Sequence, residues 1–332
     1  MIKHTRAYKK TILIASSAMD IATWQPVSKD LIHRGYDVFT YEADKVASGE
    51  VPLHIHITNA SGMVVDYGGT QLSLNEIAAA WYRRPTQFLE DNIDKAEQIR
   101  VDSERSTLQY TLWDTVPEHA WLNSPKNISH AEHKLGQLQI AREVGFKIPT
   151  TTVTNDWRSI GSSLPKDIIY KPAQGVLHRD NKLMLVFTTP LTNRPSALPI
   201  TSNPFPGIWQ PSLTKAREWR VTVVGDQVFP VAIYTNEGAK DDWRKHQTDP
   251  EKVRFEHEDF PDVLKDQCLK YLEKFGLNFG AFDFIEDDSG VITFLECNPN
   301  GQFGWLETKL ALPISQAIAD LLVQKAEENA LR

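Results

Sequence analysis

Two carboxylates and an amide stand close together in a part of the sequence that predicts a β-hairpin. Asp283 lies in the run AFDFIE, and Glu296 and Asn298 lie in the run VITFLECN. The polar segment 287–290 separates the two apolar runs and ends in glycine. Two apolar runs joined by such a turn are typical of an antiparallel pair.

The register of this hairpin decides whether the carboxylates meet. A turn that pairs Glu286 with Val291 places Asp283 opposite Phe294, on the face that also carries Glu296. The two acidic residues then become diagonal neighbours, with Cα atoms about 7–8 Å apart. At that separation both carboxylates can reach one metal ion.

Asn298 returns to the same face two residues after Glu296, so three oxygen-bearing side chains converge. Oxygen ligands of this kind suit Mg²⁺, a hard cation that proteins bind through a few carboxylates together with substrate phosphates. The alternative is that Asp283 and Glu296 are solvated strand ends. An unpaired carboxylate among so many apolar residues is costly, however, which favours a magnesium site.

Composition excludes several classes of protein. The chain has 332 residues, enough for two domains, and its formal net charge of -7 makes nucleic acid and anionic membranes poor partners. None of its 17 glycines stands in G-x-G-x-x-G, a P-loop or G-x-S-x-G. Two cysteines fit a reducing compartment, so a cytoplasmic protein is expected. The basic start before a short apolar run favours a first strand at Thr11–Ala15 over a signal peptide.

An N-terminal α/β unit is expected over residues 11–82. It contains strands at 11–15, 37–41, 54–58 and 77–84, and a helix from Pro26 to Arg34 that Gly35 ends. A polar helical segment, 88–116, follows. A boundary is expected at 123–125.

The second part begins with a helix. Ser129 and Glu132 form an S-x-x-E capping box, and apolar residues at helical spacing continue to Gly145. The elements expected next are a strand region from Ile148, a strand at 167–172, a polar hairpin at 173–182, a strand at 183–189 and a proline-rich connector at 193–206. The last third predicts strands at 207–211, 218–224 and 228–234, a helix from Pro261 to Phe275 and a final helix that Pro313 opens.

Several motifs together resemble the ATP-grasp superfamily of carboxylate–amine and carboxylate–hydroxyl ligases. The resemblance covers most of the chain and rests on Asn123 with the helix His133–Gly145 and Pro149, on Tyr170-Lys171-Pro172, on Gln210, on EWRVTVVG (218–225) and on the D…E-x-N-P hairpin. Three more selective segments resemble the microviridin-type peptide ligases, the ATP-grasp maturases of graspetides. They are WYRRP (81–85), Asp242-Trp243-Arg244 and LPISQAIADLLV (312–323).

This resemblance implies an α/β (α+β) fold in three parts: an N-terminal pre-ATP-grasp domain (1–122), a central ATP-grasp lobe (123–208) and a C-terminal lobe with the Mg-binding hairpin (209–332). It also implies that ATP phosphorylates Asp or Glu side chains of a ribosomal precursor peptide, which then form esters or amides with Ser/Thr or Lys. ATP and Mg²⁺, with two ions expected, are the implied cofactors, and a homodimer is expected.

The resemblance assigns roles to individual residues. Lys134 and Lys171 contact the ATP phosphates, and Arg220 and Arg244 stabilise the transferred phosphoryl group. The metal ligands are Asp283, Glu296 and Asn298, and the residues expected to bind the rest of the nucleotide are Gln210, Pro211, Ser212 and Glu218. Pro211 departs from the usual Gln-Glu hinge, so which carboxylate holds the ribose stays open. Cys297 replaces a common Ile or Val and is expected to point away from the metal.

A purely structural role is the alternative for several of these residues. Arg220 can pair with Glu218 on the same strand face, Arg244 with Asp241 or Asp242, and Arg83 or Arg84 can form an interdomain salt bridge. Lys134 can be an exposed helix lysine. His130, Glu132 and His133 lack the spacing of a zinc motif and are expected on a solvated face.

Two other functions stay open at this point. A RimK-like glutamate or amino-acid ligase shares the same catalytic half. A non-catalytic, ATP-gated peptide-binding module is the other, and the intact metal triad and both lysines argue against it.

Overall fold

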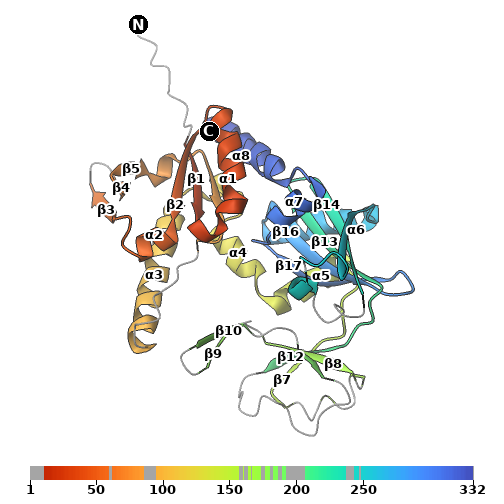
Figure 1. The fold of residues 1–332 in the computed structure, drawn as a ribbon. Coiled ribbons are helices and arrows are strands. Elements are labelled where there is room, and N and C mark those ends of the chain that lie inside the picture. The colour runs from red at the N-terminus through yellow and green to blue at the C-terminus, as the bar shows by residue number, and fades with distance from the viewer. Residues whose placement is uncertain are drawn as a thin grey trace.

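The strands of the described residues form five sheets, and helices connect and cover them (Figure 1). The computed structural model describes residues 11–59, 62–85, 95–156, 160, 164–165, 167–172, 176–179, 182–185, 189–191, 206–236, 243–246 and 248–331. The expected α/β class is confirmed, because helices and sheets alternate and mix throughout these residues.

A parallel sheet of three strands begins the fold, in the order β2-β1-β6. Its strands are β1 (Thr11–Ser16), β2 (Asp37–Glu42) and β6 (Ala79–Tyr82), which confirms three of the predicted strands. Ile12 and Ile14 belong to one core cluster, whereas Leu13 and Ala15 belong to another. The sheet is therefore covered on both faces, as parallel sheets generally are.

Helix α1 (Ile21–His33) begins five residues before the predicted start at Pro26. Proline was expected to open the helix, but Trp24 is buried and its indole Nε1 donates to the Ser17 carbonyl at 3.1 Å. Tertiary packing of the first turns thus outweighs the proline. The predicted end is confirmed, because Gly35 follows the helix with φ 87° in the left-handed region.

The predicted strand at 54–58 exists as β3 (Leu53–Thr58), but it lies in a separate sheet. β3 pairs antiparallel with β4 (Gly62–Tyr67), which pairs with β5 (Thr70–Ser73). This meander, the short helix α2 (Ala43–Ala47) and the long helix α3 (Lys95–Thr115) lie on the side of the parallel sheet away from α1 (Figure 1).

The predicted helix from Ser129 to Gly145 is two helices, and the capping-box prediction is wrong. Ser124 is the true N-cap, since its Oγ accepts from the Asn127 amide at 3.2 Å and starts α4 (Pro125–Ala131). The chain then bends before α5 (Lys134–Val144), which ends at Gly145 with φ 99° as predicted. Gln137 compensates for the break, because its Nε2 donates to the freed Ala131 carbonyl at 2.7 Å.

An antiparallel sheet of four strands, the small sheet, follows in the order β11-β8-β12-β7. Its strands are β7 (Thr152–Thr154), β8 (Ile168–Lys171), β11 (Thr189–Leu191) and β12 (Gly207–Pro211). The hairpin of β9 (Val176–Arg179) and β10 (Lys182–Leu185) confirms the expected hairpin, although its second strand extends further. Residues 186–188 of the predicted strand and 193–205 of the predicted connector lie outside the described residues.

The large sheet has five antiparallel strands in the order β15-β14-β13-β16-β17. Its strands are β13 (Arg217–Val224), β14 (Gln227–Thr235), β15 (Val253–His257), β16 (Phe279–Glu286) and β17 (Ile292–Asn298). Strand β15 was not predicted, whereas the helix at Pro261–Phe275 is confirmed as α6 (Asp262–Phe275). Helices α4, α5 and α6 pack on one face of this sheet.

The chain ends in α7 (Gly304–Leu310), which was not predicted, and α8 (Ile314–Ala330), which begins after Pro313 as predicted. Helix α8 packs against α1 and β6, so the last helix joins the first sheet. None of the helices in the described ranges combines the length and the apolarity needed to cross a bilayer.

Candidate active site

The β16–β17 hairpin brings the two acidic residues closer than the sequence predicted. Asp283 pairs directly with Glu296, not diagonally, and Glu286 pairs with Ile292 instead of Val291. The register shifts between Asp283 and Phe284, because Phe284 pairs with Phe294 and Leu295 is left over. This extra residue makes a β-bulge, and directly opposed residues have Cα atoms about 4.5–5.5 Å apart.

Because of the bulge, Phe294 and Glu296 lie on opposite faces of β17. Phe294 packs in the core with Phe282 and Phe284, so the prediction that it shares a face with Asp283 is wrong. Cys297 lies in the same core, as expected. Without the extra residue, Phe294 and Glu296 would share one face, and one of them would be misplaced.

Arg220 on β13 stands opposite Asp283 in the sheet. Its Nε lies 3.3 Å from Asp283 Oδ1, and Arg244 Nη2 donates to Asp283 Oδ2 at 3.2 Å from the 3₁₀ turn Trp243–His246. The alternative Arg220–Glu218 pair is wrong, because Glu218 pairs with Lys215 at 2.6 Å. The alternative partners of Arg244, Asp241 and Asp242, lie outside the described residues.

The guanidinium of Arg220 is buried and incompletely satisfied. Only 7% of the residue is exposed, yet Nε and Nη1 have no hydrogen-bond acceptor among the described residues. A buried donor without an acceptor costs about 1–3 kcal/mol, and more when it is charged. Such a group is suited to an anionic ligand, and the planar fork of arginine matches phosphate.

Both predicted lysines lie near the carboxylates. Lys134 is the first residue of α5, and its Nζ donates to the Pro172 carbonyl at 3.4 Å. Burial lowers the pKa of Lys171 at the end of β8, while the charges of Glu296 and Asp283 raise it and those of Lys134 and Arg244 lower it further. The small and large sheets thus meet at one cluster of charge.

The carboxyl of Asp283 is the centre of this cluster. Burial raises its pKa, the cations Arg220 and Arg244 oppose that rise, and Glu296 and Glu218 add to it. In the described residues, no group of three or more His, Cys, Asp and Glu side chains gathers as metal ligands. A metal here therefore depends on two carboxylates, the Asn298 amide and oxygens that a substrate brings, which fits Mg²⁺.

The predicted hinge residues lie at the end of β12, where the chain leaves the small sheet for the large sheet. Gln210 on β12 is buried, and its Nε2 donates to Thr151 Oγ1 at 3.0 Å, while Ser212 N donates to the Asp167 carbonyl. Pro211 borders a cavity of about 190 Å³ that reaches Ile148 and Ile285. Ile285 lies two residues from Asp283, on the same strand face.

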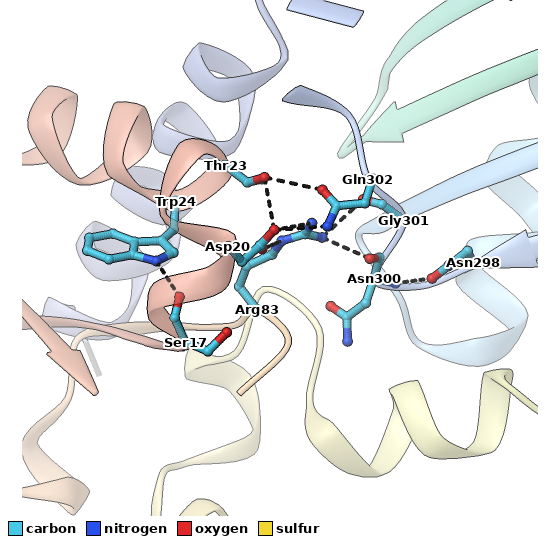
Figure 2. A network of polar contacts seen from close by, with 9 residues as sticks. All are labelled: Ser17, Asp20, Thr23, Trp24, Arg83, Asn298, Asn300, Gly301 and Gln302. Atoms are coloured by element: carbon cyan, nitrogen blue, oxygen red, sulfur yellow. Dashed lines mark hydrogen bonds and ion pairs between the residues drawn. The ribbon is translucent and has the colours of Figure 1, made fainter. Parts of the chain in front are cut away.

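A second buried arginine ties the N-terminal part to the loop after β17 (Figure 2). Arg83 is 0% exposed, and its Nε lies 2.5 Å from Asp20 Oδ2. Its Nη1 donates to the Asn300 and Gly301 carbonyls at 2.8 and 3.0 Å. The salt bridge of Arg83 therefore lies within the N-terminal part, and the expected interdomain salt bridge is not formed by this residue. Arg83 instead reaches the rest of the chain through its hydrogen bonds to two backbone carbonyls.

This network extends to a candidate metal ligand. The Asn300 amide donates to Asn298 Oδ1 at 2.9 Å, and Gln302 Nε2 donates to Asp20 Oδ1 at 2.9 Å (Figure 2). Sequence reasoning missed Asp20 and Gln302. Their partners lie up to 282 residues away, and no local spacing marks such a contact.

As an arrangement of charge, four cationic groups surround two carboxylates where the sheets meet. They are Lys134, Lys171, Arg220 and Arg244 around Asp283 and Glu296. The surplus of positive charge suits a polyphosphate with a divalent cation, which needs oxygen ligands at its metal and cations along its phosphates.

Comparisons with known proteins show which family the chain resembles in sequence and fold. A family model described as the MvdD pre-ATP grasp domain matches residues 11–129. The macrocyclase MdnC bound with precursor peptide MdnA from Microcystis aeruginosa MRC is 30% identical, with a TM-score of 0.81; the match covers 95% of this chain and 99% of that chain. No curated protein matches.

Two further solved structures are similar over their whole length. The RiPP-associated ATP-grasp ligase of Chryseobacterium gregarium, in complex with ADP and a leader and core peptide, is 26% identical with a TM-score of 0.81, covering 95% of this chain and 97% of that one. The macrocyclase MdnB from Microcystis aeruginosa MRC is 28% identical with a TM-score of 0.76, covering 95% and 99%. By its sequence and its fold, this chain belongs to the ATP-grasp ligase family of the macrocyclases MdnC and MdnB, and it is an ATP-dependent ligase of the graspetide-maturase type.

Proposed function

We propose that this ligase phosphorylates Asp or Glu side chains of a ribosomally made precursor peptide and joins them to Ser or Thr hydroxyls or Lys amines. The observation that carries the proposal is the buried, incompletely satisfied Arg220 beside Asp283, within a cluster that also holds two lysines. The relatives support the choice of substrate, because MdnC is bound with a precursor peptide and the Chryseobacterium ligase with a leader and core peptide.

The reaction has two steps. In the first, a carboxylate oxygen of the peptide attacks the γ-phosphorus of ATP, the bond to the β-phosphate oxygen breaks, and ADP leaves an acyl phosphate. In the second, a hydroxyl or amine attacks the acyl carbon, inorganic phosphate leaves, and the nucleophile loses a proton. One water is lost overall for each ester or amide bond.

In the first step, the proposed residues neutralise charge. Lys134 and Lys171 bind phosphate oxygens as point charges, and Arg220 and Arg244 hold the transferred phosphoryl group, for which the guanidinium fork is suited. Asp283, Glu296 and Asn298 would hold Mg²⁺, which supplies positive charge to the phosphate oxygens. We expect two ions, as in the resemblance noted above.

For the remaining part of the nucleotide, we propose that adenine occupies the cavity beside Pro211. Gln210 and Ser212 flank Pro211 in the same hinge and are proposed to contact the nucleotide as well. We assign the ribose to Glu218, which pairs with Lys215 in this structure. We also propose the domain division 1–122, 123–208 and 209–332, and a homodimer, which light scattering of the purified protein would test.

Asp283→Asn and Glu296→Gln are expected to abolish ADP formation while the protein remains folded. Asp288→Asn, at an exposed position in the same hairpin, serves as the matched control and should keep full turnover. Circular dichroism establishes the fold, and a coupled assay with peptide measures ADP. Retained turnover in both site variants would contradict the metal assignment.

Mass spectrometry separates the candidate functions. A precursor peptide that loses one water per bond marks macrocyclisation. A gain of an amino-acid residue marks a glutamate-type ligase. The absence of ADP release with every peptide would exclude both enzymes and favour a binding module.

A further inference from the structure

A second cavity borders Asn298, one of the proposed metal ligands. Its volume is about 280 Å³, slightly below the range of roughly 300–1,000 Å³ that small-molecule pockets occupy. A space of this size accepts one or two peptide side chains. Among the polar residues that line it are Tyr82, Arg84, Tyr110, Ser129, Glu132 and Asn298.

The cavity joins three parts of the fold. Tyr82 and Arg84 come from the end of β6, Tyr110 comes from α3, and Glu132 caps the end of α4. Asn298 forms part of the wall and is also a proposed metal ligand. The cavity is therefore adjacent to the place where the acyl phosphate would form.

The break between α4 and α5 lies beside this cavity. Glu132 ends α4 and Lys134 begins α5, so two neighbouring positions face different spaces. Lys134 reaches the strand end that carries Lys171 and Pro172, whereas Glu132 lines the cavity.

Glu132 offers the cavity a carboxylate, and its residue is exposed at the surface. Although the residue keeps contact with solvent, partial burial raises the pKa of its carboxyl, and the charges of Arg84 and His133 act in the opposite direction. Burial raises the pKa of Tyr82 as well, and the nearby Tyr110 and Glu132 add to that effect. The lining is thus a carboxylate with two phenols, next to one cation.

Arg84 holds an uncommon backbone conformation at the mouth of the cavity. Its φ is 49°, one of two positive values among non-glycine residues in the described part of the chain. Non-glycine residues in this region persist where the surrounding structure enforces them, and they gather at ligand sites. The observation is consistent with a preformed binding site.

We infer that this cavity binds the side chain that carries the nucleophile, a Ser or Thr hydroxyl or a Lys amine of the peptide. The inference rests on the proposed function. A Lys ammonium first loses one proton to solvent. Glu132 accepts the hydrogen bond of the hydroxyl or neutral amine and takes its proton as the oxygen or nitrogen attacks the acyl carbon. Phosphate leaves from the other side, toward Arg220 and Arg244, and the proton passes from Glu132 to solvent.

The reverse assignment, with the reacting carboxylate in this cavity, is disfavoured by charge. A carboxylate would meet Glu132 there, and only Arg84 would compensate. The cluster around Asp283 and Glu296 offers four cations to a carboxylate and a phosphoryl group. The cavity is therefore the better place for the neutral or cationic partner.

Glu132→Gln tests the inference, because hydroxylamine can replace the peptide nucleophile. Hydroxylamine is small and nucleophilic at neutral pH, so it traps the acyl phosphate as a hydroxamate without the cavity or a base. We expect peptide cyclisation to fall about 10²–10⁴-fold, the usual contribution of general acid–base catalysis. Hydroxamate formation should stay within about twofold of the wild type.

Ser129→Phe, at the exposed rim of the same cavity, provides a second variant that fills the space without removing the carboxylate. It should also slow cyclisation and spare the hydroxamate. Glu143→Gln, at an exposed position on α5, is the matched control and should change neither rate.

The outcomes are distinguishable. Unchanged cyclisation in both cavity variants would overturn the inference, as would an equal loss of cyclisation and hydroxamate, which would assign Glu132 to phosphorylation. A wild-type enzyme that forms ADP and hydroxamate but whose variants behave like the control leaves the proposed function intact and refutes the cavity assignment. A wild type that forms neither product contradicts the proposed function, and the inference with it.

Discussion

Arg83 and Arg220 are both buried arginines paired with an aspartate, but their surroundings differ. Arg83 donates to Asp20 and to two backbone carbonyls of the loop after β17. Arg220 lies beside Asp283 at 3.3 Å, and two of its nitrogens lack a hydrogen-bond acceptor in the described residues. The first guanidinium is satisfied by the protein, and the second is not.

This difference separates structure from function. A buried charge with all its bonds made stabilises one arrangement of the chain, since removing it leaves its partners unpaired. A buried charge with donors to spare raises the free energy of the folded protein until a ligand accepts them. The number of unused donors therefore distinguishes a structural arginine from one that binds substrate.

Arg83→Met should cause the largest effect, a loss of about 3–5 kcal/mol in the free energy of unfolding, typical of a broken buried ion pair. Asp20 would lose its cation, and the Asn300 and Gly301 carbonyls would lose a donor. Urea unfolding of the ligand-free protein measures this change. Stability equal to that of the wild type would show that the network is not structural.

Arg220→Met should reduce ADP formation about 10²–10³-fold, the usual cost of removing one donor to a developing charge. Its effect on the free energy of unfolding should be smaller than that of Arg83→Met, because Arg220 makes fewer hydrogen bonds and Arg244 still pairs with Asp283. Steady-state assays measure ADP formation, and urea unfolding of the same preparation measures the free energy of unfolding. A variant with full turnover would remove Arg220 from the site.

Mg²⁺ and a non-hydrolysable ATP analogue should stabilise the wild type by about 2.7 kcal/mol when the analogue is at 100 times its Kd. At the same concentrations, Arg220→Met should gain less, since one charge-assisted hydrogen bond contributes roughly 1.5–3 kcal/mol. Arg83→Met should keep the full gain relative to its own ligand-free form. Thermal unfolding with and without the ligands measures the three gains, and equal gains would contradict the comparison.

Arg34→Gln should have the smallest effect, about 0.2–1 kcal/mol of unfolding free energy. Arg34 also pairs with aspartates, Asp30 at 2.7 Å and Asp320 at 2.6 Å, but its side chain is 28% exposed. Water and salt screen such a pair, so salt should reduce the difference further. A loss as large as that of Arg83→Met would mean that burial does not explain the contrast.

Much of the fold could be predicted because its elements follow local rules. Alternating apolar runs marked most strands, and Gly35 and Gly145 marked helix ends, both with positive φ. The elements that were predicted wrongly depend on contacts between distant parts of the chain. The break between α4 and α5 depends on Gln137, which bonds to the backbone of Cys297 on a distant strand as well as to Ala131.

The candidate site was predicted in its residue types but not in its geometry. The chemistry of Asp283, Glu296 and Asn298 was readable, yet a regular hairpin gives the wrong register. One signal was present: Phe294 and Leu295 are consecutive apolar residues where strict alternation would place one. A bulge at that point lets Phe294 point into the core and Glu296 point to the polar face. The bulge is seen only when β17 is paired with β16.

The packing of α8 has a consequence for the order in which the protein can fold. Trp24, Val27 and Leu31 of α1 share one core with Ile318 and Leu322 of α8. Contacts so distant in sequence slow folding, because the chain must close a long loop before they form. The apolar surface of α1 that α8 covers therefore stays uncovered during synthesis until α8 has been made.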